Sequence, residues 1–207
     1  MRPPRMRVAL FGRSLAGFTL ANAMERAGHE VQMLSDPAEL SSFETLIIAV
    51  GDARLEATVE LLEPHVHRGL IVFHTCLSRG VQVLDPLETH GCVVAALAPF
   101  TLKRWAVTTL DELGETVVEL NIAEFYAETV ALSDAERAPF AARAYYAEML
   151  RRLHISAAVD AHFLSPSEEP PLVGEDMDTE EIIAAYRGAT DPGLRRSYVE
   201  VARRLGE

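Results

Sequence analysis

A short stretch near the amino terminus carries small residues at a spacing suited to phosphate. Gly12, Ser14 and Gly17 fill the three positions of a Gly-x-Gly-x-x-Gly turn, with a hydroxyl group at the middle position. After such a turn, the unpaired amides and the positive dipole end of the next helix face a pyrophosphate. Arg13 and Leu15 belong to the same turn, and the arginine could also contact a phosphate. We therefore predict that these five residues bind a nucleotide.

The elements around this turn are those that would position it. Residues 8–11 form an apolar run of strand type that stops at Gly12, and apolar residues then recur at helical spacing as far as Gly28. A second strand is predicted at residues 29–34. A strand, a glycine turn, a helix and a strand make up the mononucleotide-binding half of a Rossmann unit.

The alternation of strands and helices continues further along the chain. Apolar, β-rich runs at 45–50, 69–74 and 92–97 predict three more strands, and the spacing of leucine and valine predicts helices over 53–66 and 77–90. Strands that are apolar throughout and separated by helices indicate a parallel sheet covered on both faces. The predicted fold class is α/β, with a doubly wound, mainly parallel Rossmann sheet and a small C-terminal helical region.

Beyond the fifth strand the pattern changes. Two β-rich segments at 106–110 and 116–120 are separated by too few residues for a crossover helix, so they predict a hairpin at the edge of the sheet. From residue 123 onward the chain is predicted to be helical. We expect a dinucleotide-binding domain over residues 1–122 and a helical tail over residues 123–207 that serves dimerisation or the substrate site.

The sequence of the tail predicts a long helix, a linker and two short helices. Residues 133–136 resemble a capping box, with Pro139 as an alternative start of that helix. Residues 165–178, with three prolines and five acidic residues, predict an exposed linker. Two short helices follow, over 179–186 and from Pro192 onward. Helices this short have to pack on the sheet, on each other or on a second subunit.

The composition limits the classes of function. The 207 residues carry a formal net charge of −12, which argues against general binding of nucleic acid, because the phosphate backbone requires clustered cations. No apolar run approaches the roughly 20 residues that cross a bilayer, so we expect a soluble, cytoplasmic protein without a membrane partner. Cys76 and Cys92 have no metal-ligand spacing, so we expect reduced cysteines and no bound metal.

With five strands placed, the chain resembles the Rossmann domains of the 6-phosphogluconate dehydrogenase-like superfamily, near pyrroline-5-carboxylate reductase and prephenate dehydrogenase. The resemblance covers about residues 6–99 and rests on residues 12–17, 25–31, 48–52 and 72–76. It implies that the first domain binds NAD or NADP and that the protein is an oxidoreductase for a small polar metabolite. It also implies a homodimer, with substrate between the first domain and a tail that is shorter here than in the family.

Three loops at the carboxyl end of the sheet depart from that family. Gly51 stands where the family has proline, Cys76 and Leu77 replace a serine–glycine pair, and Ala98 stands where many members have histidine. Cofactor and substrate bind at this edge of such a sheet, so Val50, Gly51 and Cys76 are predicted cofactor contacts. Two alternatives stay open: a nucleotide-binding sensor without turnover, and a dimeric interaction protein on a degenerate Rossmann fold.

The end of the second strand bears on the choice of dinucleotide. A carboxylate there can bind both ribose hydroxyls of NAD and repels the extra phosphate of NADP. Ser35 and Asp36 occupy these positions, which favours NAD slightly, whereas Arg13 is compatible with the NADP phosphate. The alternative role of Asp36 is to cap the turn before Pro37.

Candidates for proton transfer follow the strands that end at the expected cleft. His74 ends the fourth strand, and an imidazole exchanges protons near neutral pH; the alternative is a buried histidine bonded to backbone. Lys103 follows the fifth strand and could act as an acid or neutralise an anionic substrate; the alternative is a solvated lysine. Asp52 is interpreted as a helix cap, and Asn121 as a further candidate for contact with substrate.

Overall fold

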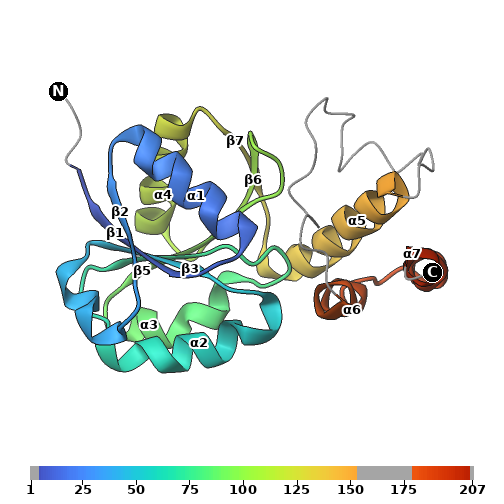
Figure 1. Ribbon diagram of the computed structural model, residues 1–207, viewed down its shortest axis with the longest axis horizontal. Coiled ribbons are helices and arrows are strands. Elements are labelled where there is room, and N and C mark those ends of the chain that lie inside the picture. Colours follow the sequence, from blue (N-terminus) through green and yellow to red (C-terminus); the bar gives the residue numbers. More distant parts are fainter. Residues whose placement is uncertain (1–4, 153–178, 206–207) are drawn as a thin grey trace.

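The computed structural model describes residues 5–152 and 179–205 (Figure 1). Within them the chain forms a seven-stranded sheet in the order β2-β1-β3-β4-β5-β6-β7. The strands are β1 (Arg7–Gly12), β2 (Glu30–Met33), β3 (Thr45–Ala49), β4 (Ile71–His74), β5 (Val93–Pro99), β6 (Arg104–Thr109) and β7 (Glu128–Ala131). The first five are mutually parallel, whereas β6 pairs antiparallel with β5 and parallel with β7. The predicted fold class is confirmed.

Helices cover both faces of this sheet. The α-helices are α1 (Leu15–Ala27), α2 (Leu55–Leu62), α3 (Asp85–Thr89), α4 (Glu112–Phe125), α5 (Asp134–Arg152), α6 (Thr179–Arg187) and α7 (Pro192–Leu205). Short 3-10 helices are η1 (Pro37–Ser42), η2 (Asp52–Arg54), η3 (Glu63–His65) and η4 (Val81–Leu84). In Figure 1, α1 and α4 lie on one face of the sheet, and α2 and α3 lie on the other.

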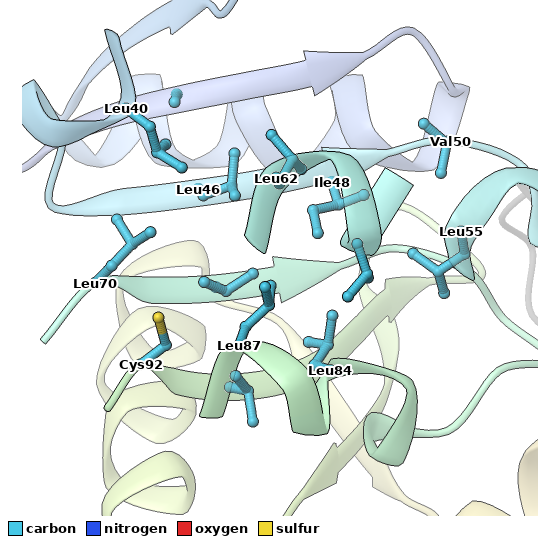
Figure 2. Close-up of a cluster of buried hydrophobic side chains, with 14 of the residues drawn as sticks. Leu40, Leu46, Ile48, Val50, Leu55, Leu62, Leu70, Leu84, Leu87 and Cys92 are labelled. Atoms are coloured by element: carbon cyan, nitrogen blue, oxygen red, sulfur yellow. The ribbon is translucent and has the colours of Figure 1, made fainter. Parts of the chain in front are cut away.

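The two faces of the sheet bury separate apolar clusters. Figure 2 shows the cluster under α2 and α3, which contains Ile48 of β3 together with Leu55, Leu62 and Leu87. On the other face, Ile47 of β3 belongs to the cluster that α1 and α4 cover. Every residue of β3 is buried, which explains why the sequence shows a continuous apolar run rather than alternation.

The end of the sheet differs from the prediction. Residues 116–120 belong to α4 and not to a strand, so the predicted hairpin with 106–110 is wrong. Asp111 caps α4 by accepting a hydrogen bond from the Gly114 amide at 2.7 Å, and Val118 and Ile122 bury at helical spacing. The β-branched residues suggested a strand, but this cap and the burial on the sheet favour a helix. The sheet instead ends with β7, within a region predicted to be wholly helical.

Two predicted helices are shorter than expected. The helix predicted over 53–66 is α2 flanked by η2 and η3, and the one predicted over 77–90 is η4 followed by α3. Pro86 occupies the first turn of α3, where its missing amide costs no hydrogen bond. The proline therefore starts this helix rather than lying inside a longer one.

The tail packs partly on the sheet and partly on itself. The capping-box prediction is confirmed, since the Ser133 amide donates to the Glu136 carboxylate at 2.8 Å, and Pro139 lies inside α5 rather than at its start. The first half of α5 packs through Phe140 against Phe100, which follows β5. Its second half extends away from the sheet and packs on α6 and α7 (Figure 1). Tyr198 of α7 is buried in the apolar cluster that these three helices share.

The predicted linker at 165–178 lies outside the described residues. The division into two domains at residue 122 stays a prediction, and β7, the last strand of the sheet, lies beyond that residue. Among the helices of the described residues, none is both long and apolar enough to cross a membrane.

Candidate functional site

The glycine turn between β1 and α1 is shaped by close contact with β3. Gly12 has a φ of +103°, and a Cβ atom at this position would lie 2.1 Å from the Ala49 carbonyl oxygen. A Cβ atom on Gly17 would lie 2.1 Å from the Cβ of Ala49. Real atoms cannot approach so closely, so both positions require glycine. The first and third glycines of the fingerprint therefore have the roles expected of them, a tight turn and close helix–strand packing.

Ser14, at the middle position, is compatible with the turn. Its φ of −67° is ordinary for any residue, and its hydroxyl caps α1 by accepting a hydrogen bond from the Gly17 amide at 3.1 Å. The Ser14 amide donates to the Ala49 carbonyl at 3.0 Å. Within the described residues the amides of Leu15 and Ala16 have no hydrogen-bond partner, so the first turn of α1 keeps two donors for an anion.

Ser35 and Asp36 lie exposed at the end of β2, beside the glycine turn. The Asp36 carboxylate accepts a hydrogen bond from the Ala38 amide at 2.9 Å and thereby caps η1. The capping role weighed from the sequence is thus present. The other carboxylate oxygen has no partner among the described residues, so capping and a contact with ribose are compatible.

The loop after β3 brings Val50, Gly51 and Asp52 to the same edge. Val50 is buried, and its carbonyl accepts a hydrogen bond from the Cys76 thiol at 3.1 Å. Gly51 has an ordinary φ of −72°, and a Cβ atom there would meet only Glu181 Oε1 of α6, at 3.7 Å. Asp52 accepts a hydrogen bond from the Ser78 hydroxyl, and burial of its carboxyl raises its pKa.

His74 ends β4 and is fully buried. Its Nε2 lies 3.0 Å from the Gly80 carbonyl oxygen, and its Nδ1 accepts a hydrogen bond from the Cys76 amide at 3.3 Å. These partners require a neutral ring with the proton on Nε2. Burial lowers its pKa to about 3, with a further lowering by the charge of Arg137. The geometry matches the alternative of a buried, backbone-bonded histidine, and the catalytic role stays a prediction.

Cys76 is buried in the loop that follows β4. Burial raises the pKa of its thiol well above the usual value, and the neighbouring Asp52 carboxylate raises it further. A thiolate is the reactive form of cysteine, so this side chain is poorly suited to act as a nucleophile. Its geometry supports a role in fixing the loop after β4 rather than in covalent chemistry.

Lys103 lies at the carboxyl edge of the sheet, whereas Asn121 lies inside helix α4. Lys103 is exposed in the turn between β5 and β6, which is at the carboxyl edge because β5 runs parallel to β1, β3 and β4. Asn121 was expected after the last strand, but it is buried within α4 and donates to the Val117 carbonyl at 2.7 Å. Its proposed contact with substrate had rested on the wrong assignment of 116–120 as a strand.

Sequence reasoning missed two residues of α5 that contact the loop after β4 and the residues just beyond it. The Arg137 guanidinium is fully buried and donates to the Cys76 carbonyl at 2.8 Å. The Asp134 carboxylate accepts hydrogen bonds from the amides of Val81 and Gln82, at 2.8 and 3.2 Å. Arg137 lies three positions before Phe140 and seven before Ala144, so helical spacing puts its charge on the buried face of α5, and this is the available signal.

A separate hollow lies between α4 and β7. Its volume is about 1110 Å³, and its lining includes Val107, Glu115, Ile122 and Ala131. None of the predicted cofactor or catalytic residues is among the described residues that line it. The candidate site is therefore the carboxyl edge of β1, β3, β4 and β5, and not this hollow.

Comparison with known proteins agrees with the observed fold. The Rossmann-like domain family matches residues 36–99, a range that begins after the glycine turn. No curated protein matches the chain by sequence. The chain thus contains a Rossmann-like domain, as the sequence predicted.

Solved structures share the arrangement at low sequence identity. The 3-hydroxyisobutyrate dehydrogenase of Mycobacterium tuberculosis, with L-serine, is 11% identical, with a TM-score of 0.65 over 99% of this chain and 95% of that one. The pyrroline carboxylate reductase of Plasmodium falciparum, with NADP bound, is 11% identical, with a TM-score of 0.55 over 97% of this chain and 76% of that one. The prephenate dehydrogenase of A. aeolicus, in complex with hydroxyphenyl propionate and NAD+, is 12% identical, with a TM-score of 0.54 over 98% of this chain and 85% of that one.

These likenesses concern the fold. They extend over the tail as well as the sheet, since each alignment covers nearly the whole chain. The likeness therefore shows a shared Rossmann-type fold.

Proposed function

We propose that this protein is an NAD(P)-dependent oxidoreductase that acts on a small polar metabolite. The observation that carries the proposal is the glycine turn, in which Gly12 and Gly17 are required by contact with Ala49. That contact holds the first turn of α1 at the edge of the sheet, with the amides of Leu15 and Ala16 available. The dehydrogenase structures that share the fold support the same assignment.

The residues present fit a dinucleotide. The Ser14 hydroxyl is directed at the Gly17 amide, so it does not occupy the space in front of the Leu15 and Ala16 amides where a pyrophosphate would bind. Arg13 is exposed and can add a cation to the same site. Ser35 and Asp36 lie at the end of β2, where a ribose would lie.

NAD is the slightly favoured cofactor. The Asp36 carboxylate can accept hydrogen bonds from ribose hydroxyls, and its charge would repel the additional phosphate of NADP. The bound dinucleotide would supply the hydride chemistry, and the protein has to orient it and supply or accept a proton. Lys103 is the candidate for this proton, or for neutralising an anionic substrate, because it lies exposed at the same edge. We further propose a cytoplasmic homodimer that contacts neither nucleic acid nor membrane.

Titration of the protein with NADH and NADPH, followed by calorimetry, tests the proposal. We expect saturable binding of NADH and weaker binding of NADPH. Replacement of Asp36 by arginine should reverse this order, because a cation at this position favours the 2′-phosphate. Glu39→Arg, which introduces the same charge change at another exposed position of η1, is the control and should leave the order unchanged.

The outcomes separate the alternatives. Binding of NADPH without NADH would show that the role given to Asp36 is wrong. Binding of neither dinucleotide would refute the proposed function and leave the interaction protein as the better hypothesis.

A nucleotide-binding sensor is the second candidate, because His74 and Cys76 are buried and engaged with backbone groups. Oxidation of bound NADH across a panel of small keto acids and imines distinguishes an enzyme from a sensor. If the protein turns over, Lys103→Met should lower the turnover without weakening cofactor binding. Cofactor binding with no turnover on any member of the panel would favour the sensor.

A further inference from the structure

The loop over residues 75–80, which follows β4, is held by hydrogen bonds to the ends of β3 and β4. His74 Nε2 lies 3.0 Å from the Gly80 carbonyl oxygen, and the Cys76 amide donates to His74 Nδ1 at 3.3 Å. The Cys76 thiol donates to the Val50 carbonyl at 3.1 Å. These bonds fix both ends of the loop against β3 and β4.

Helix α5 holds the same loop from the tail. Arg137 Nη2 donates to the Cys76 carbonyl at 2.8 Å, and its Nη1 donates to the Thr108 hydroxyl at 3.2 Å. Asp134, one turn earlier, binds the amides of Val81 and Gln82 just beyond the loop. A Cβ atom on Gly80 would lie 2.2 Å from the Asp134 carboxyl carbon, so the loop and α5 are in direct contact.

If Arg137 served stability alone, a fully buried guanidinium would be an unfavourable choice for this contact. Its side chain is fully buried, no carboxylate of the described residues lies within ion-pair distance, and its Nε has no hydrogen-bond partner. Burial lowers its pKa to about 10, so the group stays charged at neutral pH. A hydrophobic residue of similar volume would fill the space without the desolvation cost of a guanidinium. A role in fixing geometry accounts for the charged residue.

Thr75, the first residue of the loop, contacts the glycine turn. The Thr75 hydroxyl lies 3.3 Å from the Ser14 hydroxyl, and the Thr75 amide donates to the Ile48 carbonyl at 3.3 Å. Ser14 in turn accepts the hydrogen bond of the Gly17 amide. A continuous path of contacts therefore runs from Arg137 through Cys76, Thr75 and Ser14 to the first turn of α1.

We propose that Arg137 is a positioning residue for the nucleotide site: by holding the loop at Cys76, it sets the Thr75–Ser14 contact and so the geometry of the glycine turn. Through this path the tail and the glycine turn are coupled, and a change at Arg137 alters the affinity for dinucleotide. This inference rests on the proposed function for its link to cofactor, but its structural part does not.

Hydrogen–deuterium exchange of the full chain without ligand tests the structural part. In Arg137→Met we expect faster exchange in peptides that cover 75–82 and also in those that cover 13–17. Arg137→Lys keeps the charge and one donor, so it should restore part of the protection at 75–82 and 13–17. It also serves if the methionine variant does not fold. Met149→Ala removes a buried side chain from the distal half of α5, against α6 and α7, and is the control for general destabilisation.

The exchange result has two outcomes that would overturn the proposal. One is faster exchange at 75–82 with wild-type exchange at 13–17 in both Arg137 variants. The other is the same pattern of exchange in Met149→Ala, which would show that any loosening of α5 produces it.

Calorimetric titration with NADH, or with NADPH if only that binds, tests the functional part. We expect Arg137→Met to weaken binding by about threefold or more, as for residues of one hydrogen-bond network. Thr75→Val removes the hydroxyl contact to Ser14, and the double variant should bind no more weakly than the weaker single variant, because both act on one path. Fully additive effects would overturn the coupling. If the wild-type protein binds neither dinucleotide, the proposed function fails, and the exchange experiment still decides the role of Arg137.

Discussion

Replacement of Gly17 by alanine tests whether the close packing of α1 on β3 shapes the glycine turn between β1 and α1. The added methyl group would lie 2.1 Å from the Cβ and 2.9 Å from the Cα of Ala49, whereas carbon atoms in contact are normally about 3.5–4.0 Å apart. Ala49 is fully buried in the centre of the sheet, so it cannot yield. Helix α1 would have to move away from β3 by more than an ångström.

The expected magnitude follows from two opposing effects. Overpacking of a well-packed core costs about 1–3 kcal/mol, and alanine in place of glycine in a helix returns up to about 1 kcal/mol. We expect a net loss of about 1–2 kcal/mol in the free energy of unfolding. For a chain of this size, each kcal/mol lowers the melting temperature by about 2–4 °C.

Urea unfolding followed by circular dichroism measures this loss. Gly51→Ala is the matched control, because the backbone there is ordinary and the new methyl group would meet only Glu181 Oε1 at 3.7 Å; its stability should be unchanged or slightly higher. In the double variant Gly17→Ala with Ala49→Gly, part of the overlap disappears, so the two changes should couple favourably. Wild-type stability in Gly17→Ala would refute the argument from packing, and binding of NADH unchanged in that variant would separate the turn from the proposed site.

Two further predictions concern buried titratable groups. Because burial lowers the pKa of His74 from 6.5 to about 3, the folded protein binds that proton less tightly than the unfolded chain. Stability is thus unaffected by His74 above about pH 6.5, and falls by up to about 1.4 kcal/mol per pH unit as the pH drops toward 3. Urea midpoints across this range should show a steeper fall for the wild type than for His74→Asn; equal slopes would contradict the burial. Cys76 and Cys92 are buried with raised thiol pKa values, that of Cys92 to about 11, so a thiol reagent at pH 8 should label them only after unfolding. Labelling of either in the native protein at the rate of a free thiol would count against this.

The features that the sequence predicted are those set by local pattern. The strand, turn and helix from β1 to α1 follow from an apolar run, two glycines and helical spacing, and the structure adds the reason why Gly12 and Gly17 are glycine. The capping box at Ser133 and the start of α7 after Asp191 were likewise predictable, because a cap acts within one turn of its own helix. Continuous apolar strands identified the parallel sheet for the same kind of reason.

Features that depend on packing between distant segments were decided only by the tertiary structure. Residues 116–120 have strand-like side chains, but they form part of α4 because Val118 and Ile122 bury on the sheet face beside α1. β7 is a four-residue edge strand whose pairing with β6 no local pattern indicates.

The contacts of Arg137 and His74 belong to the same category. Arg137 meets a carbonyl 61 residues away, and the ring of His74 is enclosed by a loop that α5 holds in place. Sequence spacing places a histidine at the end of a strand, but its burial determines whether the ring can take up a second proton and become charged. The amino-acid sequence by itself thus determined the five parallel strands and the glycine turn between β1 and α1. The fold alone decided which side chains at that edge remain available for chemistry, because burial and hydrogen-bond partners come from residues far apart in the chain.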